Sequence, residues 1–369
     1  MSKDGDVNAS PRRRVLFVLR GKLGDTISAY ATVLAYGEAH PADAITLLVR
    51  ANYAPLFARE RGLRLIGFSS RIAMFARLLW LRWTEPPFDA LLVLLGYGPP
   101  IRRLGRLVRA ARKIYLDARF REVYPEWPEL PPGHLQSEPA WRIARMFAPG
   151  LAQPRQVRIP GLAALRRTRI SQPGVIGIAP VSDEPRRSMG PATLRLLIEA
   201  LAREQPGRAI HVLLNRSDAD ARPLLAMARD GGLPAGARLR FFPTLEQLFA
   251  ELACLEHLHA TDTGLYHLAA AMGVPLTTYF GPTQPQRNGF PAQPALTRVR
   301  IAALGGEHCE EKGCLRPVCL EIPVARHHGA EPPAYDLHER PPGCLLRAHA
   351  REDLRQLRVD SPQALEQSR

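Results

Sequence analysis

The chain has 369 residues, 46% of them hydrophobic and 23% charged, which is the composition of a globular enzyme too long for one hydrophobic core. No run of about 18 apolar residues occurs, and the apolar run at 15–19 is too short for a secretory signal, so we expect a cytoplasmic protein without a membrane span. The net charge of +15 comes mostly from arginine and favours anionic partners.

The first half of the chain alternates short apolar runs with helical patterns. We predict buried parallel strands over residues 15–19, 44–49, 90–95 and 113–116. Between the first two runs, Ile27, Ala31 and Leu34 recur at helical spacing, which places an apolar helix face on the sheet. The pattern predicts a doubly wound α/β domain.

A loop with two glycines, Arg20-Gly21-Lys22-Leu23-Gly24-Asp25, joins the first strand to that helix. Ligands of this fold class bind at the carboxyl ends of the strands, and glycine lets the backbone approach them closely. Arg20 and Lys22 would keep the Asp25 carboxylate ionised and able to accept a proton. The alternative is that Asp25 only caps the helix.

Eight basic residues crowd the segment from Arg102 to Arg121, in which Asp117 is the one acid. Such a segment attracts polyanions. Nucleic acid is not expected because the chain has neither zinc-finger spacing nor an RNA-recognition signature, so an anionic glycan or lipid headgroup fits better. The alternative is an arginine-decorated, solvated helix face.

A second set of apolar runs follows a Pro-, Ala-, Arg- and Gln-rich stretch over 149–173. We place the domain boundary in this stretch, with domains at 1–165 and 166–369. The second domain is predicted to be doubly wound as well, with parallel strands over 175–180, 209–214, 239–242, 257–261 and 276–280.

Two loops of the second domain carry candidate ligand groups. Thr261-Asp262-Thr263-Gly264 ends a predicted strand and opens a helix, whose free backbone N–H groups suit a diphosphate. His267 lies near the first helical turn and away from the sheet, where it can donate to a phosphate or a sugar hydroxyl, unless it is an ordinary surface histidine. The loop after 175–180 holds Ser182 and Arg187, and an arginine there can neutralise a departing phosphate, although a solvated turn is the alternative.

Cysteines gather in a less periodic segment, 305–344, and a last helix is expected near 350–367. Four thiols can make one tetrahedral metal site of a structural kind, and unlinked thiols are the alternative, since disulfides are not expected in the cytoplasm. The candidate ligands are Cys309, Cys314, Cys319 and Cys344.

Three segments of the chain together resemble one known family. They read VLFVLRGKLGDTISAYATVLAY at 15–36, ATDTGLYHLAAAMGVPLTTYFGPTQPQRNG at 260–289 and CEEKGCLRPVCL at 309–320. Through them the chain resembles glycosyltransferase family 9, the ADP-heptose:lipopolysaccharide heptosyltransferases and their relatives, from about residue 14 to 350. The second segment is the most specific of the three.

The resemblance implies an α/β GT-B fold: two facing Rossmann-like domains with parallel sheets, the first for the acceptor and the second for the nucleotide sugar. It implies that Asp25 is the catalytic base and that Asp262, Thr263, Gly264 and His267 belong to the donor-diphosphate loop. Arg187 stands where the family usually has a lysine that contacts phosphate, and a subset of relatives binds iron through a cysteine cluster.

Two positions depart from the family pattern. Ala31 replaces a usual proline, which leaves the acceptor open, and Met189 replaces a usual tryptophan, which leaves the sugar and the nucleotide open. No Asp-x-Asp pair stands directly at the end of a predicted strand, so we expect transfer without a divalent metal cofactor.

We therefore predict an inverting glycosyltransferase. It would move a heptose or similar sugar from an ADP-sugar-type donor to a lipopolysaccharide core, a related glycan or a protein, and would contact the inner membrane peripherally. The cysteine cluster would hold structural iron or zinc. The alternatives are a non-catalytic nucleotide-sugar-binding scaffold and a nucleotide-sugar epimerase of the same fold.

Overall fold

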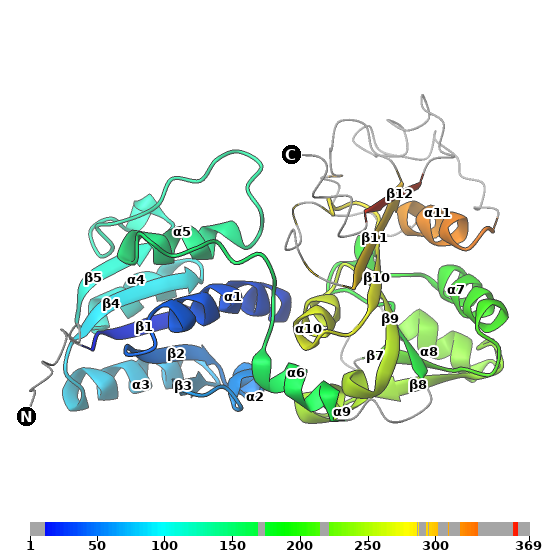
Figure 1. Ribbon diagram of the computed structural model, residues 1–369, viewed down its shortest axis with the longest axis horizontal. Helices are drawn as coiled ribbons and strands as arrows, with labels where there is room; N and C mark the ends of the chain where they lie inside the picture. The colour runs from blue at the N-terminus through cyan, green and yellow to red at the C-terminus, as the bar shows by residue number, and fades with distance from the viewer. Residues whose placement is uncertain are drawn as a thin grey trace, which may run out of the picture. The chain divides into compact units, whose positions relative to one another are not determined.

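The computed structural model describes residues 12–168, 174–214, 221–285, 287, 293, 295–301, 309, 318–330 and 357–360. The chain divides into two units, residues 1–154 and 155–369 (Figure 1). This division falls within the predicted boundary stretch, and residues 155–165 lie in the second unit rather than the first.

The first unit is a parallel sheet with the strand order β3-β2-β1-β4-β5, and helices cover both of its faces. The order reverses between β1 and β4, so the loop after β1 lies at the position where ligands bind in such sheets. The strands are β1 (Arg14–Leu19), β2 (Ala44–Arg50), β3 (Leu63–Phe68), β4 (Phe88–Leu95) and β5 (Ala110–Tyr115). The helices are α1 (Leu23–Ala39), α2 (Ala54–Phe57), α3 (Arg71–Thr84), α4 (Pro99–Leu107) and α5 (Glu138–Phe147), with 3-10 turns η1 (Ala51–Tyr53) and η2 (Ala118–Phe120).

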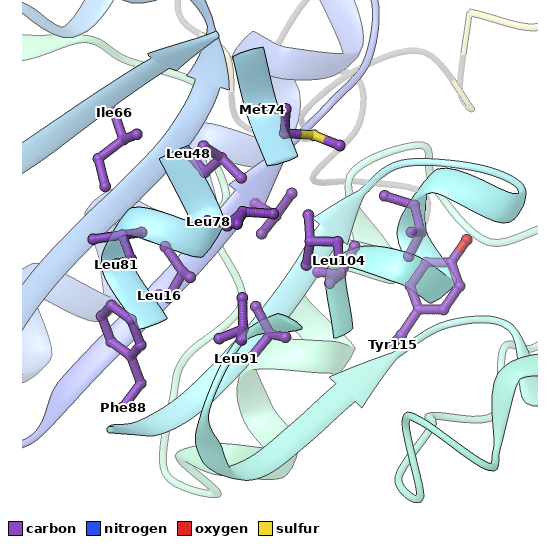
Figure 2. Close-up of a cluster of buried hydrophobic side chains, with 14 of the residues drawn as sticks. Leu16, Leu48, Ile66, Met74, Leu78, Leu81, Phe88, Leu91, Leu104 and Tyr115 are labelled. Carbon is purple, nitrogen blue, oxygen red and sulfur yellow. The ribbon is translucent and has the colours of Figure 1, made fainter. Parts of the chain in front are cut away.

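One core cluster of this unit lies between the sheet and the helices α3 and α4 (Figure 2). Successive strand side chains point to opposite faces, so Leu16 and Leu48 face α3, where Leu78 meets them, while α4 contributes Leu104. All four are fully buried. On the other face α1 packs against α5.

The second unit is a sheet of seven strands with the order β12-β11-β10-β9-β6-β7-β8. All of its pairings are parallel except the one between β11 and β12. The strands are β6 (Val175–Ala179), β7 (Ala209–Leu214), β8 (Ala237–Phe241), β9 (Leu255–Thr261), β10 (Leu276–Phe280), β11 (Leu296–Ile301) and β12 (Leu357–Asp360). The helices are α6 (Pro160–Arg167), α7 (Pro191–Glu204), α8 (Arg222–Arg229), α9 (Leu245–Cys254), α10 (Gly264–Met272) and α11 (Val318–His327), with the 3-10 turn η3 (Pro185–Arg187).

The prediction of a helix near 350–367 is wrong for residues 357–360, which form the strand β12. This strand pairs antiparallel with β11 from Arg298↔Asp360 to Ile301↔Leu357. The pairing gives hydrogen-bond partners to the edge of β11, which helical periodicity in a short segment does not reveal. The rest of that segment lies outside the described residues.

Both units have the predicted α/β architecture, and α6 occupies part of the stretch that looked aperiodic in sequence. Within the described ranges, no helix combines the length and apolar character that crossing a bilayer requires.

Candidate active site

The loop after β1 depends on a close contact between two strands. Arg20 N–H donates to the Leu95 carbonyl at 2.8 Å, which holds the loop against the end of β4. A Cβ on Gly21 would lie 2.1 Å from Leu95 Cδ2, so any larger residue there would require the Leu95 side chain to shift. Lys22 occupies the N-terminal cap position of α1, and its side chain makes no capping hydrogen bond.

Asp25 lies in the first turn of α1 and is partly exposed. It does not occupy the cap position, so the simple capping alternative does not describe it, although a negative charge in a first turn is favoured by the helix dipole. Gln136 Nε2 donates to Asp25 Oδ1 at 2.6 Å from the loop that precedes α5. Local burial and then the charge of Asp25 raise the pKa of Tyr97 above its ordinary value. Gln136 therefore holds one oxygen of the carboxylate, Oδ1, while the residue stays partly exposed to solvent.

Three arginines lie close to one another at this edge of the first sheet. Arg20 follows β1, Arg50 ends β2 and Arg71 begins α3 just after β3. Burial, followed by the positive charges of Arg50 and Arg71, lowers the pKa of Arg20. An anion bound among them would relieve this repulsion, which makes the edge suitable for an acidic ligand.

The basic segment from Arg102 to Arg121 is partly neutralised by the fold. Arg102 and Arg106 both pair with Glu122, and Arg112 pairs with Glu126, so acids just beyond the segment fold back on it. Arg119 binds Asp117 at 2.7 Å. The segment is thus largely solvated and several of its arginines are paired with acids, while its binding of a polyanion stays a prediction.

Asp262 is the residue that joins three loops of the second unit. It is 3% exposed, and its Oδ2 accepts from Arg187 Nη1 at 3.0 Å and from Thr283 Oγ1 at 2.9 Å. Ser182 Oγ donates to its carbonyl at 3.2 Å. The loops after β6, β9 and β10 are therefore held together by one buried carboxylate.

The loop after β6 is not the solvated turn that was the alternative. Ser182 and Ser188 are buried and close the loop, since the Ser182 N–H donates to Ser188 Oγ at 3.0 Å. Arg187 is half-buried, and its Nη2 also reaches Asp183 at 2.9 Å. Burial lowers the pKa of Arg187, but Asp262 outweighs this effect, and the net pKa is raised.

Helix α10 presents its N-terminus to the same group of loops. Thr263 is its cap residue and makes no side-chain capping bond, and the first backbone N–H groups of an α-helix have no acceptor within the helix. His267 is 5% exposed and packs against the Tyr266 ring, with 4.4 Å between the centroids. The surface-histidine alternative is therefore wrong, because α10 is buried on nearly every side from Tyr266 to Met272. Thr261 is fully buried, and Gly264 is the first helical residue.

Of the four cysteines proposed as metal ligands, Cys314 and Cys344 lie outside the described residues. Cys309 is buried, and its N–H donates to the Pro282 carbonyl at 2.9 Å. Cys319 lies beside Gly281, where an added Cβ would come within 3.0 Å of its sulfur. Cys309, through its backbone, and Cys319, through its sulfur, thus border the loop after β10. The described part of the chain contains no group of three metal-binding side chains.

Sequence reasoning missed several residues of these two edges. Gln136 is 111 positions from Asp25, a separation at which no sequence pattern indicates a contact. Arg50 and Arg71 had a usable signal, because both follow strands of a parallel sheet, but β3 was not predicted. Thr283 lies in the loop after the strand predicted over 276–280, and its position at a strand end is what indicates a site residue.

The comparisons with known proteins point to one family. The model of glycosyltransferase family 9 (heptosyltransferase) matches residues 243–319, which include the loop at Asp262. Lipopolysaccharide heptosyltransferase 1 of Pseudomonas aeruginosa is 31% identical over 158 residues, which is 43% of this chain. The match spans 36% of that relative's own length.

Solved structures agree at the level of the fold. The Escherichia coli heptosyltransferase WaaC with ADP matches 80% of this chain and 94% of its own, at a TM-score of 0.62 and 20% identity. The iron-containing dodecameric glycosyltransferase TibC of enterotoxigenic E. coli matches 81% of this chain and 65% of its own, at a TM-score of 0.51 and 14% identity. The chain thus has the GT-B fold, and its second unit carries a sequence match to the glycosyltransferase family 9 model.

Proposed function

We propose that the chain is an inverting glycosyltransferase that moves a heptose or similar sugar from an ADP-sugar-type donor. The observation that carries this proposal is the buried Asp262 carboxylate, which gathers Arg187, Thr283 and the N-terminus of α10. A guanidinium and the backbone N–H groups at a helix N-terminus are donors that suit a nucleoside diphosphate. WaaC, a structural relative, has been solved with ADP and with ADP-2-deoxy-2-fluoro heptose.

The diphosphate of the sugar donor would replace a contact that Arg187 makes with an exposed side chain. Arg187 Nη2 binds Asp183, whose side chain is about half exposed, while Nη1 stays on the buried Asp262. A diphosphate can therefore displace Asp183 without disturbing the inner contact. Ser182, Thr261 and His267 lie behind this surface, and we assign them the task of holding the loops and α10 in place.

Asp25 would act as the general base in a single displacement. The acceptor oxygen attacks the anomeric carbon as Asp25 takes its proton, and the bond from that carbon to the diphosphate oxygen breaks. The nucleoside diphosphate leaves with the electron pair, held by Arg187 and the α10 N–H groups. General-base assistance contributes roughly 10²- to 10⁴-fold, so positioning and charge stabilisation supply the remainder.

The acceptor would be anionic and would bind at the first unit. Arg20, Arg50 and Arg71 repel one another there, and Lys22 is exposed beside them. Gly24 keeps the backbone next to Asp25 free of a side chain. A phosphorylated or carboxylated glycan of the lipopolysaccharide kind fits this surface, as does a lipid-linked or protein-linked acceptor that carries acidic groups.

Cys309, Cys314, Cys319 and Cys344 would hold a structural metal, iron being favoured by the likeness to TibC. The two described thiols border the same loop after β10, which suits a metal that secures this loop. Such a metal would supply stability to the donor-binding edge and take no part in the transfer.

Product analysis tests the proposal directly. Purified protein is incubated with a panel of nucleotide sugars, with and without a deacylated lipopolysaccharide core, and the products are separated by mass spectrometry. Sugar transfer only in the presence of acceptor is expected. Sugar isomerisation without acceptor would show an epimerase, and donor binding without any product would show a binding scaffold, and either result would overturn the proposal.

A further inference from the structure

Helix α3 exposes an apolar stripe on the side that faces away from the core. Its members are Ile72 and Trp83, with 82% and 78% of their surface exposed, and Leu79 and Trp80, each about half exposed. The opposite side carries Met74, Leu78 and Leu81, which are buried in the core cluster of the first unit. Both sides of the helix are apolar, although only one of them packs on the sheet.

The four exposed side chains lie on one side of α3. Leu79, Trp80 and Trp83 follow Ile72 by seven, eight and eleven positions. These spacings place all four on the same side of an α-helix. At 1.5 Å per residue the stripe is about 16 Å long. Single exposed apolar residues are common on protein surfaces, but a stripe of this length with two tryptophans indicates a binding surface.

The charges around the stripe are positive. Helix α3 contains Arg71, Arg77 and Arg82 and no acidic residue. The guanidinium of Arg64 on β3 lies 5.9 Å from the centre of the Trp80 ring. The nearest acid in sequence, Glu85, is already paired with Arg14 and with Arg64. The stripe therefore has basic borders without free acidic groups among the described residues at its ends.

We propose that α3 docks this chain on an anionic lipid surface, with Ile72, Leu79, Trp80 and Trp83 inserted at the level of the headgroups. Tryptophan favours the membrane interface, and arginines beside an apolar helix face bind anionic lipid. A second copy of the chain is a poorer occupant, because a two-fold contact of α3 with itself would bring arginines against arginines. The docking surface exists independently of any transfer reaction.

Helix α3 begins close to the loop that contains Asp25. Arg71 at the start of the helix is one of the charges that act on Arg20, which follows β1 in the same loop as Asp25. A bilayer in contact with the stripe would therefore lie near the acceptor edge of the first unit. Lipid-linked acceptors would reach Asp25 without leaving the membrane.

Vesicle flotation tests the docking surface without any sugar donor. We expect the full chain to float with vesicles of phosphatidylethanolamine and phosphatidylglycerol, and to bind vesicles of phosphatidylcholine at least tenfold more weakly. Trp80→Gln with Trp83→Gln should weaken binding to the anionic vesicles by about tenfold or more, because two inserted rings are lost. Trp127→Gln, which changes an exposed tryptophan outside α3, is the matched control and should bind as the native chain does.

Quenching by brominated lipid locates the contact. The chain has four tryptophans, so Trp80→Phe with Trp83→Phe should keep vesicle binding and lose most of the quenching, whereas Trp127→Phe should lose neither. Circular dichroism confirms that each variant is folded. The proposal is overturned if the native chain ignores anionic vesicles, if the Gln pair binds them normally, or if sedimentation shows a dimer that the Gln pair dissociates.

Discussion

Arg187 Nη1 lies 3.0 Å from Asp262 Oδ2, in an ion pair that joins the loop after β6 to the loop after β9. The two residues are 75 positions apart in the chain, and the carboxylate is almost completely buried. The other terminal nitrogen, Nη2, lies on the exposed side, 2.9 Å from Asp183 and 3.4 Å from Glu184. One arginine thus has an inner acid that fixes it and outer acids that a ligand can replace, Asp183 being the nearer.

This arrangement predicts different results for two Asp→Asn substitutions on the same arginine. Asp262→Asn should lower the free energy of unfolding by about 1 to 3 kcal/mol, because a half-buried guanidinium loses its inner counter-charge. It should also weaken ADP binding about tenfold or more, since the loops are no longer held together. Urea unfolding and calorimetry measure the two effects.

Asp183→Asn is the matched control for that experiment. Its carboxylate is about half exposed, so the unfolding free energy should change by less than about 0.5 kcal/mol. ADP binding should be unchanged or tighter, because the diphosphate no longer competes with Asp183. Equal losses of stability in both variants would contradict the assigned difference between the inner and the outer acid.

A buried histidine cluster predicts that acid destabilises the second unit. His259 lies 3.0 Å from the Tyr279 hydroxyl, which lies 2.8 Å from His328, and His328 contacts Glu204. Burial lowers the pKa of His257 and, much further, that of His259, and neighbouring histidine charges add to the effect. A lowered folded-state pKa means that only the unfolded chain takes up these protons as the pH falls below about 6.5.

Stability should therefore be constant above about pH 7 and fall below it, by up to about 1.4 kcal/mol per pH unit for each histidine that stays neutral in the fold. Urea unfolding between pH 5 and 8 measures this slope. His259→Gln should reduce it, whereas His134→Gln, a partly exposed position of the first unit, should leave it unchanged. A slope that is insensitive to His259→Gln would show that other groups cause the acid lability.

The arginines at the acceptor edge predict a dependence on salt. Raising the ionic strength from 0.05 to 0.5 M should raise the apparent KM for an anionic acceptor severalfold, because exposed charges are screened over shorter distances. Arg50→Gln should raise the same KM about threefold to tenfold and leave the KM of the donor unchanged. Arg229→Gln on α8 is the control, and an equal effect of both substitutions would argue against a localised acceptor site.

Transfer is expected to continue without a divalent metal. Arg187 and the N–H groups of α10 supply the positive groups for the diphosphate, so addition of EDTA to an assay with purified enzyme should leave the initial rate within about twofold. Loss of the rate, with recovery on addition of Mg²⁺ or Mn²⁺, would contradict this assignment. Asp218 and Asp220, an Asp-x-Asp pair outside the described residues, would then be the first positions to substitute.

The strands and loops that line up with apolar runs could be predicted from the sequence. β1, β2, β4, β6, β7 and β10 are short and mostly apolar segments, whereas β9 also contains Glu256 and two histidines. Asp25 lies in the loop and helix start after β1, and Asp262 follows β9 directly. In β3 exposed and partly exposed residues stand between the buried ones, so no continuous apolar run marked it. β12 was invisible because its pairing partner β11 is about 60 positions away.

The contacts of the site could not be predicted in the same way. Gln136 reaches Asp25 from a loop 111 residues later, and Thr283 reaches Asp262 from the loop after the neighbouring strand β10. The burial of His267 was not predicted, because helical spacing gives the side of a helix on which a residue lies but not what covers that side. Such contacts depend on the tertiary structure, which the periodicity of the sequence does not reveal.

The most direct test of the account is the Asp25→Asn variant, assayed for turnover and for donor binding on the same protein. The account predicts that kcat falls by about 10² to 10⁴-fold while the Kd for ADP stays within about twofold, because Asp25 acts on the acceptor and Arg187 and α10 hold the diphosphate. Glu129→Gln, an exposed carboxylate of the first unit, should leave both quantities unchanged. Undiminished turnover in Asp25→Asn, or loss of ADP binding together with turnover, would contradict the account.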